Sequence, residues 1–314
     1  MNGFGVRYAA IDVGTVSTRL LIADVGGGEV TEILRRTIIT HLGEGLTETG
    51  RLSDEAMARV ANVVQGFVRD CAEAGAERTM AVATSACRDA SNGEVLLDML
   101  DRLGVRPEII SGAREAQLSF LGATYGLDDE DILVADIGGG STELILGAIE
   151  EAEGERTIDV EAARSFDVGS RRVTELFLRS DPPTRSERDA AMARMTDELR
   201  PFFDNLHERP RCLIALAGTA TSLSAIHLGL EKYDASVVHG SKLSGGDLVQ
   251  LKDDLARMTV EERKRIPSLD PGRAGVIVAG AMILETVLAL AGLDELIVSE
   301  HDILYGMVLE LAAE

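Results

Sequence analysis

The stretch Asp12-Val13-Gly14-Thr15-Val16-Ser17-Thr18-Arg19-Leu20 returns as Asp136-Ile137-Gly138-Gly139-Gly140-Ser141-Thr142-Glu143-Leu144, 124 residues later. Both copies read Asp-x-Gly-x-x-Ser-Thr-x-Leu, with an apolar, strand-like run on either side. Each copy therefore predicts a β-hairpin whose turn carries Asp, Gly, Ser and Thr. Glycine permits a tight turn and exposes backbone N–H groups to a ligand, and the hydroxyls add further donors. The repeat predicts two related halves that face one anionic group, most simply a phosphate.

An Asp-x-Gly turn is also ordinary turn chemistry that needs no ligand. A single copy would not separate the two interpretations. Two copies matched at five positions favour the functional one.

The two copies differ at one charged position, where Arg19 in the first corresponds to Glu143 in the second. Arginine can hold a phosphate through two parallel hydrogen bonds. A carboxylate can orient or deprotonate a water molecule, or bind a divalent metal ion. Asp136 and Glu143 are thus candidate metal ligands, with Asp12 a further candidate.

Composition narrows the class of protein. The chain has 314 residues, 45% of them hydrophobic, and a net charge of −22. The negative charge argues against nucleic-acid binding, because that needs a basic surface. Three widely spaced cysteines predict neither a disulfide framework nor a zinc site and favour a reducing compartment. Without a secretory signal layout or an uninterrupted membrane-spanning run, we expect a cytoplasmic protein that binds no membrane.

Strand and helix signals alternate in both halves, which predicts an α/β architecture with helices covering the sheets. We place the boundary between residues 1–126 and 127–314, in the acidic turn Gly126–Asp131. The final helix, from His301, is a candidate to cross back onto the first half.

Three more segments place polar groups at the end of a predicted strand, where open α/β sheets bind ligands. Thr84–Asp89 contains Arg88, and Ser111–Ala116 opens a helix with Glu115 in its first turn. Gly218–Ser222 repeats the strand–glycine–helix design. A solvated loop or a plain helix start explains each of these segments about as well.

Two single residues complete the search for site groups. Arg273 follows Asp270-Pro271-Gly272 at the start of an apolar helix and is a candidate for the ligand cleft. His239 lies in a loop, where a lone histidine is more often exposed to solvent than catalytic.

Taken together, these segments resemble the exopolyphosphatase/guanosine pentaphosphate phosphohydrolase family, within the actin-like ATPase-domain superfamily. The resemblance covers nearly the whole chain. It is carried by Asp12–Arg19, Ala83–Ala90, Glu108–Ala116, Asp136–Glu143, Gly169–Glu175, His239-Gly240 and Ile266–Arg273.

The resemblance implies two actin-like (ribonuclease H-like) domains, with polyphosphate entering a cleft between them. It maps Glu115 to the family's catalytic base, Glu143 to the acid that closes the second phosphate motif, and Arg88 to the family's arginine before Asp-Ala. The expected catalytic residues are Glu115 and Glu143. The expected phosphate-binding residues are Gly14, Thr15, Ser17, Arg19, Arg88, Gly138, Gly139, Gly140, Ser141, Thr142, Gly218, Thr219, His239 and Arg273.

The chain departs from the family pattern at three places. Thr15-Val16 replaces a Ser-Asn pair in the first turn, and Arg114 replaces the first acid of a Glu-Glu pair. Leu304-Tyr305-Gly306 stands where Arg-Glu-Gly is common. These changes bear on chain-length preference and on individual phosphate contacts.

The expected function is an exopolyphosphatase, dependent on Mg²⁺ or Mn²⁺, that releases terminal orthophosphate from inorganic polyphosphate of short chain length. One alternative is a guanosine pentaphosphate 5′-phosphohydrolase, which cleaves the same kind of bond, with guanosine tetraphosphate a related ligand. A polyphosphate/ATP-linked phosphotransferase and a non-catalytic sensor are the others. A homodimer is expected from the resemblance alone.

Overall fold

The computed structural model describes residues 5–127, 131–152 and 155–314. The chain divides into two compact units, one made of residues 1–122 and 303–314 and the other of residues 123–302. The predicted boundary at Gly126–Asp131 includes residues 128–130, which lie outside the described residues. The division at residues 126 and 127 stays a prediction.

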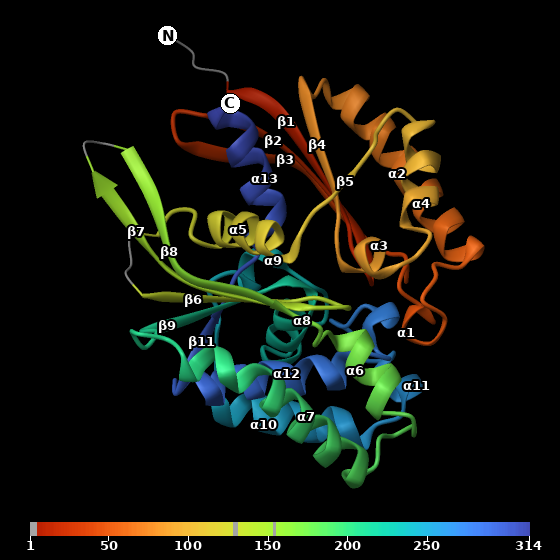
Figure 1. Cartoon of the computed structure of the whole chain (residues 1–314), viewed down its shortest axis with the longest axis vertical. Coiled ribbons are helices and arrows are strands. Elements are labelled where there is room, and N and C mark those ends of the chain that lie inside the picture. The colour runs from red at the N-terminus through yellow and green to blue at the C-terminus, as the bar shows by residue number, and fades with distance from the viewer. Residues whose placement is uncertain (1–4, 128–130, 153–154) are drawn as a thin grey trace. The chain divides into compact units, whose positions relative to one another are not determined.

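The first unit contains a five-stranded sheet in the order β3-β2-β1-β4-β5. Strands β1 and β2 pair antiparallel as the first predicted hairpin, while β1, β4 and β5 run parallel. Its elements (Figure 1) are β1 Val6–Val13, β2 Ser17–Gly26, β3 Glu29–Ile39, α1 Leu46–Thr49, α2 Asp54–Ala74, β4 Arg78–Ala83, α3 Ser85–Asp89, α4 Gly93–Asp101, β5 Glu108–Ile109, α5 Gly112–Ala123 and α13 Ile303–Ala313.

Helices cover both faces of this sheet. Alternate residues of β1, including Ile11 and Val13, join one buried cluster with the apolar side of α2. The C-terminal helix α13 packs against β1, β2 and β4. Asp12 therefore lies on the face opposite to that of Ile11 and Val13.

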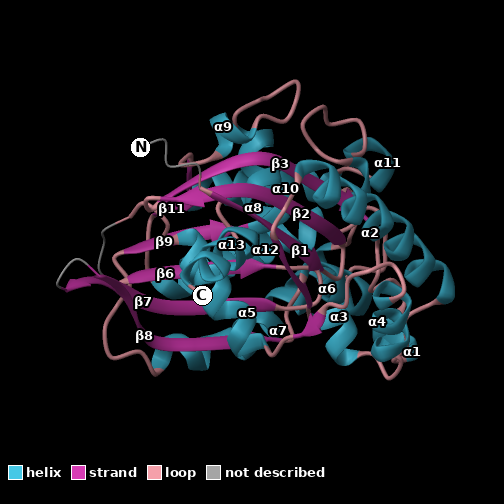
Figure 2. Cartoon of the chain, turned by 90° about the horizontal axis from the view of Figure 1, so that it is seen from above, coloured by secondary structure: helices cyan, strands magenta, loops and turns pink. Residues whose placement is uncertain are grey.

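The second unit contains a six-stranded sheet in the order β10-β11-β9-β6-β7-β8. Figure 2 shows β11, β9, β6, β7 and β8 side by side in magenta. Strands β6 and β7 form the second predicted hairpin, and β6, β9 and β11 run parallel. Its elements are β6 Ile132–Ile137, β7 Thr142–Ala152, β8 Glu155–Phe166, α6 Ser170–Phe177, α7 Arg185–Asp204, β9 Cys212–Leu216, α8 Ala217–His227, α9 Ala235–Val238, β10 Lys242–Ser244, α10 Gly245–Arg257, α11 Val260–Arg263, the 3₁₀ turn η1 Pro271–Arg273, α12 Ile277–Ala291 and β11 Glu295–Val298.

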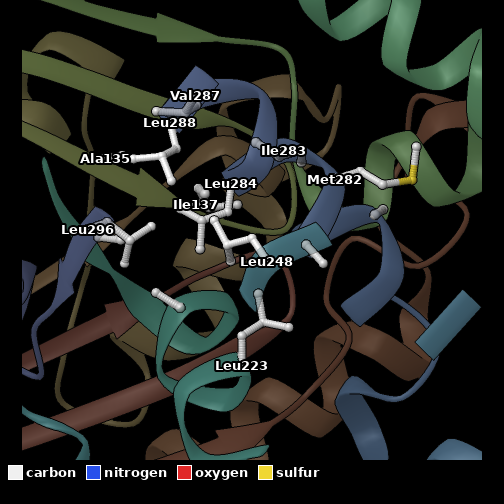
Figure 3. Packing of buried hydrophobic residues seen from close by; sticks show 14 of the residues in the cluster. Ala135, Ile137, Leu223, Leu248, Met282, Ile283, Leu284, Val287, Leu288 and Leu296 are labelled. Atoms are coloured by element: carbon white, nitrogen blue, oxygen red, sulfur yellow. The ribbon is translucent and has the colours of Figure 1, made fainter. Parts of the chain in front are cut away.

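One hydrophobic cluster fills the space between this sheet and its helices. Ala135 and Ile137 of β6 meet Ile283, Leu284 and Val287 of α12, as Figure 3 shows. The α12 sequence is apolar nearly all round, as expected for a helix buried between a sheet and other helices.

The central strands have the same arrangement in both units, with β1, β2, β3 and β4 equivalent to β6, β7, β8 and β9. The predicted α/β class is confirmed, and so is the actin-like topology of each unit. The short strand β10 was not predicted. The helix expected to start at Gly218 begins one residue earlier, at Ala217.

Candidate active site

Parallel strands gather the predicted site residues at one edge of each sheet. In the first unit, Val13 pairs with Ala83 and Ala83 with Ile109, so the residues that follow these three strand ends are neighbours. The N–H of Thr84 donates to the carbonyl of Val13 at 3.2 Å. This carboxyl-end edge is where open α/β sheets bind ligands.

The two repeated turns have the same backbone geometry. Gly14 N–H donates to the Ser17 carbonyl at 3.0 Å, and Gly138 N–H donates to the Ser141 carbonyl at 3.0 Å. A Cβ atom would lie 3.0 Å from that oxygen at Gly14 and 3.2 Å at Gly138. Glycine at both positions therefore allows the tight closure that the sequence repeat predicted.

In the second turn, the carbonyl groups point at the start of α6. Gly138 and Gly139 accept from the N–H groups of Ser170 and Arg171 at 2.9 Å each, and Gly140 accepts from Arg172 Nε at 2.8 Å. In a planar trans peptide the N–H points opposite to the preceding carbonyl. The N–H groups of Gly139, Gly140 and Ser141 are consequently directed away from α6, as successive donors for an anion.

In the first turn, the carbonyl groups accept hydrogen bonds from a loop, where those of the second turn accept them from a helix. The Thr15 carbonyl accepts from Gly43 N–H at 2.9 Å, and the Val16 carbonyl accepts from the N–H groups of Thr40 and His41. By the same geometry, the N–H groups of Val16 and Ser17 point away from that loop.

Thr15 makes two side-chain contacts within the first unit. Its hydroxyl hydrogen-bonds the Ser85 hydroxyl at 2.8 Å, and its methyl packs where a side chain at Gly43 would be. Thr15 thus ties the first turn to the start of α3, which follows β4.

The charged residues that differ between the copies sit directly opposite the repeated aspartates. Arg19 pairs with Asp12 across β1 and β2, and both Nε and Nη2 donate to Asp12 Oδ2, at 2.8 and 2.6 Å. Glu143 pairs with Asp136 across β6 and β7, so two carboxylates share one face of the sheet.

These two carboxylates are nearly excluded from solvent, Asp136 being 6% and Glu143 1% exposed. The Ser165 hydroxyl donates to Glu143 Oε1 at 2.6 Å, a contact the sequence did not indicate. Like charges directly opposite each other destabilise a sheet, whereas carboxylate oxygens and water are the ligands that Mg²⁺ prefers. The pair fits a hydrated divalent cation. Among the described residues, no three His, Cys, Asp or Glu side chains are clustered to hold a metal ion.

Glu115 and Arg88 form an ion pair in the first unit. Arg88 Nη1 donates to Glu115 Oε2 at 3.2 Å and to the Ile110 carbonyl at 3.0 Å. Glu115 lies in the first turn of α5 and is 9% exposed. Arg88 therefore holds a nearly buried carboxylate at the carboxyl-end edge of the sheet.

The neighbouring departure, Arg114, has a separate partner. Its guanidinium forms an ion pair with Glu310 of α13. The extra positive charge beside Glu115 is thus balanced within the first unit. Tyr305, another departure, donates its hydroxyl to Glu32 at 2.9 Å.

Gly218, Thr219 and Arg273 come together in the second unit. Arg273 Nη1 donates to the Gly218 carbonyl at 2.8 Å, and a Cβ on Gly218 would lie 2.2 Å from Arg273 Cζ. Thr219 packs against Gly280 of α12 and donates to the Ile137 carbonyl at 3.4 Å, which links α8 to the end of β6.

His239 belongs to a different group of side chains. It is exposed, its Nδ1 accepts from Glu300 N–H at 3.2 Å, and its ring lies 4.2 Å from that of His301. Tyr233 lies between this group and the one around Gly218 and Arg273. Its hydroxyl donates to Glu300, and it also lies near Arg273. Burial, followed by the charge of Glu300, raises the pKa of Tyr233.

Within the described residues, no helix is both long and apolar enough to cross a membrane.

The two sheets of matching topology, each with its copy of the repeated turn, define a two-domain protein of the actin-like class. The model of the Ppx/GppA phosphatase family matches residues 21–313, and the chain belongs to that family. This confirms the resemblance found in the sequence.

The relatives and solved structures cover nearly the whole chain. The Exopolyphosphatase 2 of Mycobacterium tuberculosis is 42% identical, over 98% of both chains. Among solved structures, an exopolyphosphatase-like protein has a TM-score of 0.91 and 38% identity, covering 98% of this chain and 97% of that one. The Aquifex aeolicus Ppx/GppA family member has a TM-score of 0.79 and 32% identity, over 98% of both.

Proposed function

We propose that the protein is an exopolyphosphatase that removes terminal orthophosphate from inorganic polyphosphate by hydrolysis. The observation that carries the proposal is the Arg88–Glu115 pair, which places a held carboxylate at the sheet edge that also bears a phosphate-type turn. Full-length similarity to a named exopolyphosphatase supports the same substrate.

The proposed step is attack by water on the terminal phosphorus. The water oxygen bonds to that phosphorus as the bond to the bridging oxygen breaks, which leaves orthophosphate and a chain one phosphate shorter. Glu115, aided by Glu143, orients the water, and Glu115 accepts its proton. Arg88 fixes the Glu115 carboxylate, so it acts as a positioning residue for the base.

The repeated turns are proposed to bind the phosphate oxygens. Their donors are the N–H groups of Val16, Ser17, Gly139, Gly140 and Ser141, with the Ser17 and Ser141 hydroxyls. Fixed donors of this kind stabilise the charge that spreads over the transferred phosphoryl group. Arg19, Arg88 and Arg273 are proposed to offset the substrate charge. Gly14, Thr15, Gly138, Thr142, Gly218, Thr219 and His239 remain proposed contacts.

Mg²⁺ or Mn²⁺ is the proposed cofactor, with Asp136 and Glu143 as the residues that would hold it. When bound there, the ion would neutralise phosphate charge and lower the barrier to attack. Asp12 is a weaker proposal as a ligand, because Arg19 already donates twice to its Oδ2 atom.

Orthophosphate release with Mg²⁺ tests the proposal, using short polyphosphate, long polyphosphate and guanosine pentaphosphate, each with and without ADP. We expect release from polyphosphate, fastest from short chains, without ADP. Release from the nucleotide alone would favour the alarmone hydrolase, and ADP-dependent ATP formation would favour a phosphotransferase. Polyphosphate binding without turnover would favour a sensor.

The role of Glu115 is tested by Glu115→Gln, which should lower turnover by about 10²- to 10⁴-fold and leave polyphosphate binding intact. Glu94→Gln is a matched control, because Glu94 also lies in a first helical turn and pairs with an arginine, Arg106. Near-normal turnover of Glu115→Gln would remove its assignment as base.

A cytoplasmic location and a homodimer are also proposed. The thiols of Cys71 and Cys87 are unpaired and buried, which suits a reducing compartment. Light scattering after size-exclusion chromatography tests the dimer, and cell fractionation tests the location.

A further inference from the structure

A cavity of about 310 Å³ lies among three helices of the second unit. Helix α7 supplies Arg185, Arg188 and Met192, which lie on one face because they are three and four residues apart. Helix α10 supplies Lys252 and Asp253, and α12 supplies Met282. None of these residues belongs to the proposed phosphate site.

The cavity is apolar at depth and charged toward its opening. Met282 is fully buried, and Figure 3 shows its side chain directed away from those of Leu248 and Leu284. The side chains of Lys252 and Arg188 are 16% and 27% exposed, whereas that of Arg185 is 88% exposed. The partly buried cations Lys252 and Arg188 therefore lie closer to solvent than the buried side chain of Met282.

The carboxylate between these two cations is loosely held. Asp253 Oδ1 lies 3.5 Å from Arg188 Nη1 and 3.6 Å from Lys252 Nζ, both longer than a good charge-assisted hydrogen bond. Lys252 has a closer partner behind it, Glu285 at 3.0 Å. At the rim, Asp189 lies 3.6 Å from Arg185.

Arginine carries five N–H donors and lysine three, more than these contacts use. Arg188 Nε is buried without a hydrogen-bond partner among the described residues. An orphaned buried donor is costly, so a change that supplies acceptors to this guanidinium is favoured.

We propose that this cavity binds a small molecule bearing an oxyanion, either a phosphate or a carboxylate group. Arg188 and Lys252 hold the oxyanion, and Met192 and Met282 contact the rest of the molecule. The volume matches the small end of small-molecule sites. The lining is mostly charged, and the two methionines are its apolar part. Methionine suits such a lining because its side chain adapts to irregular shapes.

Methionine methyl NMR on the full chain tests the proposal, because Met192 and Met282 report from inside the cavity. Their signals are assigned with Met192→Leu and Met282→Leu. Orthophosphate, acetate and potassium chloride at matched ionic strength are titrated separately. We expect a saturable displacement of both signals by orthophosphate or by acetate and none by chloride, and the responding anion identifies the oxyanion.

Two variants check that the cations cause this response. Arg188→Gln and Lys252→Met should each weaken the response by about tenfold or more, as expected when a hydrogen bond to a charged group is lost. Arg194→Gln is the matched control, since Arg194 lies on α7 but pairs with Glu198 outside the cavity. Its response should equal that of the unchanged protein.

Three outcomes would overturn the proposal. They are unmoved Met192 and Met282 signals with both oxyanions, an equal shift with chloride, and an undiminished response in both cation variants. The last would assign the shift to an oxyanion bound elsewhere. Because catalysis is not measured, the result is independent of the proposed hydrolysis.

Discussion

Arg88 shows how one side chain can set the geometry of another. The same Nη1 atom donates to Glu115 Oε2 and to the Ile110 carbonyl, so the guanidinium fixes the carboxylate relative to the end of β5. A lysine is expected to hold the carboxylate less firmly, because its ammonium ends a flexible stem, whereas the planar guanidinium fixes the directions of its N–H bonds.

We therefore expect Arg88→Lys to lower kcat for polyphosphate by about 10²-fold, in line with the loss of one positioned electrostatic group. Steady-state kinetics should show a smaller change in KM, since the turn N–H groups remain. Arg106→Lys is the control, because Arg106 also forms ion pairs, with Glu94 and Asp98, but at an exposed site. Equal losses in the two variants would contradict a specific role for Arg88.

The three cysteines differ in reactivity because their surroundings differ. Burial, followed by the charge of Asp70, raises the pKa of Cys71 to about 11. Burial, followed by Asp12 and Glu94, raises the pKa of Cys87 to about 12. At pH 8 both are almost entirely thiols, and the thiolate is the reactive form.

Iodoacetamide at pH 8 should consequently label the half-exposed Cys212 first in the folded protein. Peptide mass spectrometry over time measures this, and labelling in denaturant should reach all three cysteines. Labelling of native Cys87 as fast as Cys212 would show that the buried environment of Cys87 opens readily.

At the scale of elements, the start of α7 is a capping box with an extended set of contacts. Glu187 Oε2 accepts from the Thr184 N–H at 2.7 Å and from its hydroxyl, while Oε1 accepts from the N–H groups of Arg179 and Ser180. These bonds favour the charged form, the Thr184 backbone bond most, and lower the pKa of Glu187 to about 2.

A carboxyl group with a lowered folded-state pKa stabilises the fold above its unfolded pKa, near 4.5, and loses that contribution as the pH falls toward 2. Glu187→Gln should therefore lower the urea midpoint at pH 7, and the difference should shrink between pH 4.5 and pH 3. Glu231→Gln, at an exposed position, should show no such trend. A difference that is constant with pH would mean that the amide loses packing rather than charge-dependent hydrogen bonds.

An element could be predicted from the sequence where the residues that determine it are close together in the chain. The two hairpins were predictable because the apolar runs and the turn residues that close them lie within a dozen residues. Strand β10 was not, because only Leu243 of its three residues is buried, which leaves no alternating pattern to recognise. Its place is set by pairing with β11, more than fifty residues away.

The same distinction applies to the candidate site. Gly14 and Gly138 follow from the repeat, but the direction of the N–H groups in the second turn depends on Ser170, Arg171 and Arg172, about thirty residues further on. The contact of Arg273 with Gly218 spans 55 residues. Such contacts exist only once the chain is folded, so a single sequence indicates the residue types and not their partners.

At the scale of the whole molecule, the chain passes between its two units twice, after Gly122 and after Asp302. The second passage brings α13 into the first unit, where it buries Leu304, Met307, Val308 and Leu311. Its crossing with α5 requires glycine, because a Cβ on Gly306 would lie 1.9 Å from the Leu118 carbonyl oxygen. The first unit is thus completed by the last twelve residues of the chain.

Gly306→Ala should destabilise the first unit selectively. The extra methyl meets backbone, which cannot rotate away, so a cost of about 1–3 kcal/mol is expected for overpacking. Hydrogen exchange should show faster exchange in β1, β2 and α5, while β6, β7 and β9 keep their protection, because the largest buried cluster of the second unit includes no residue of the first. Gly275→Ala is the control, since nothing lies within 4 Å of a Cβ at that position. Equal loss of protection in both units would instead mean that they unfold as one cooperative body, and the two-unit division would then describe contacts but not stability.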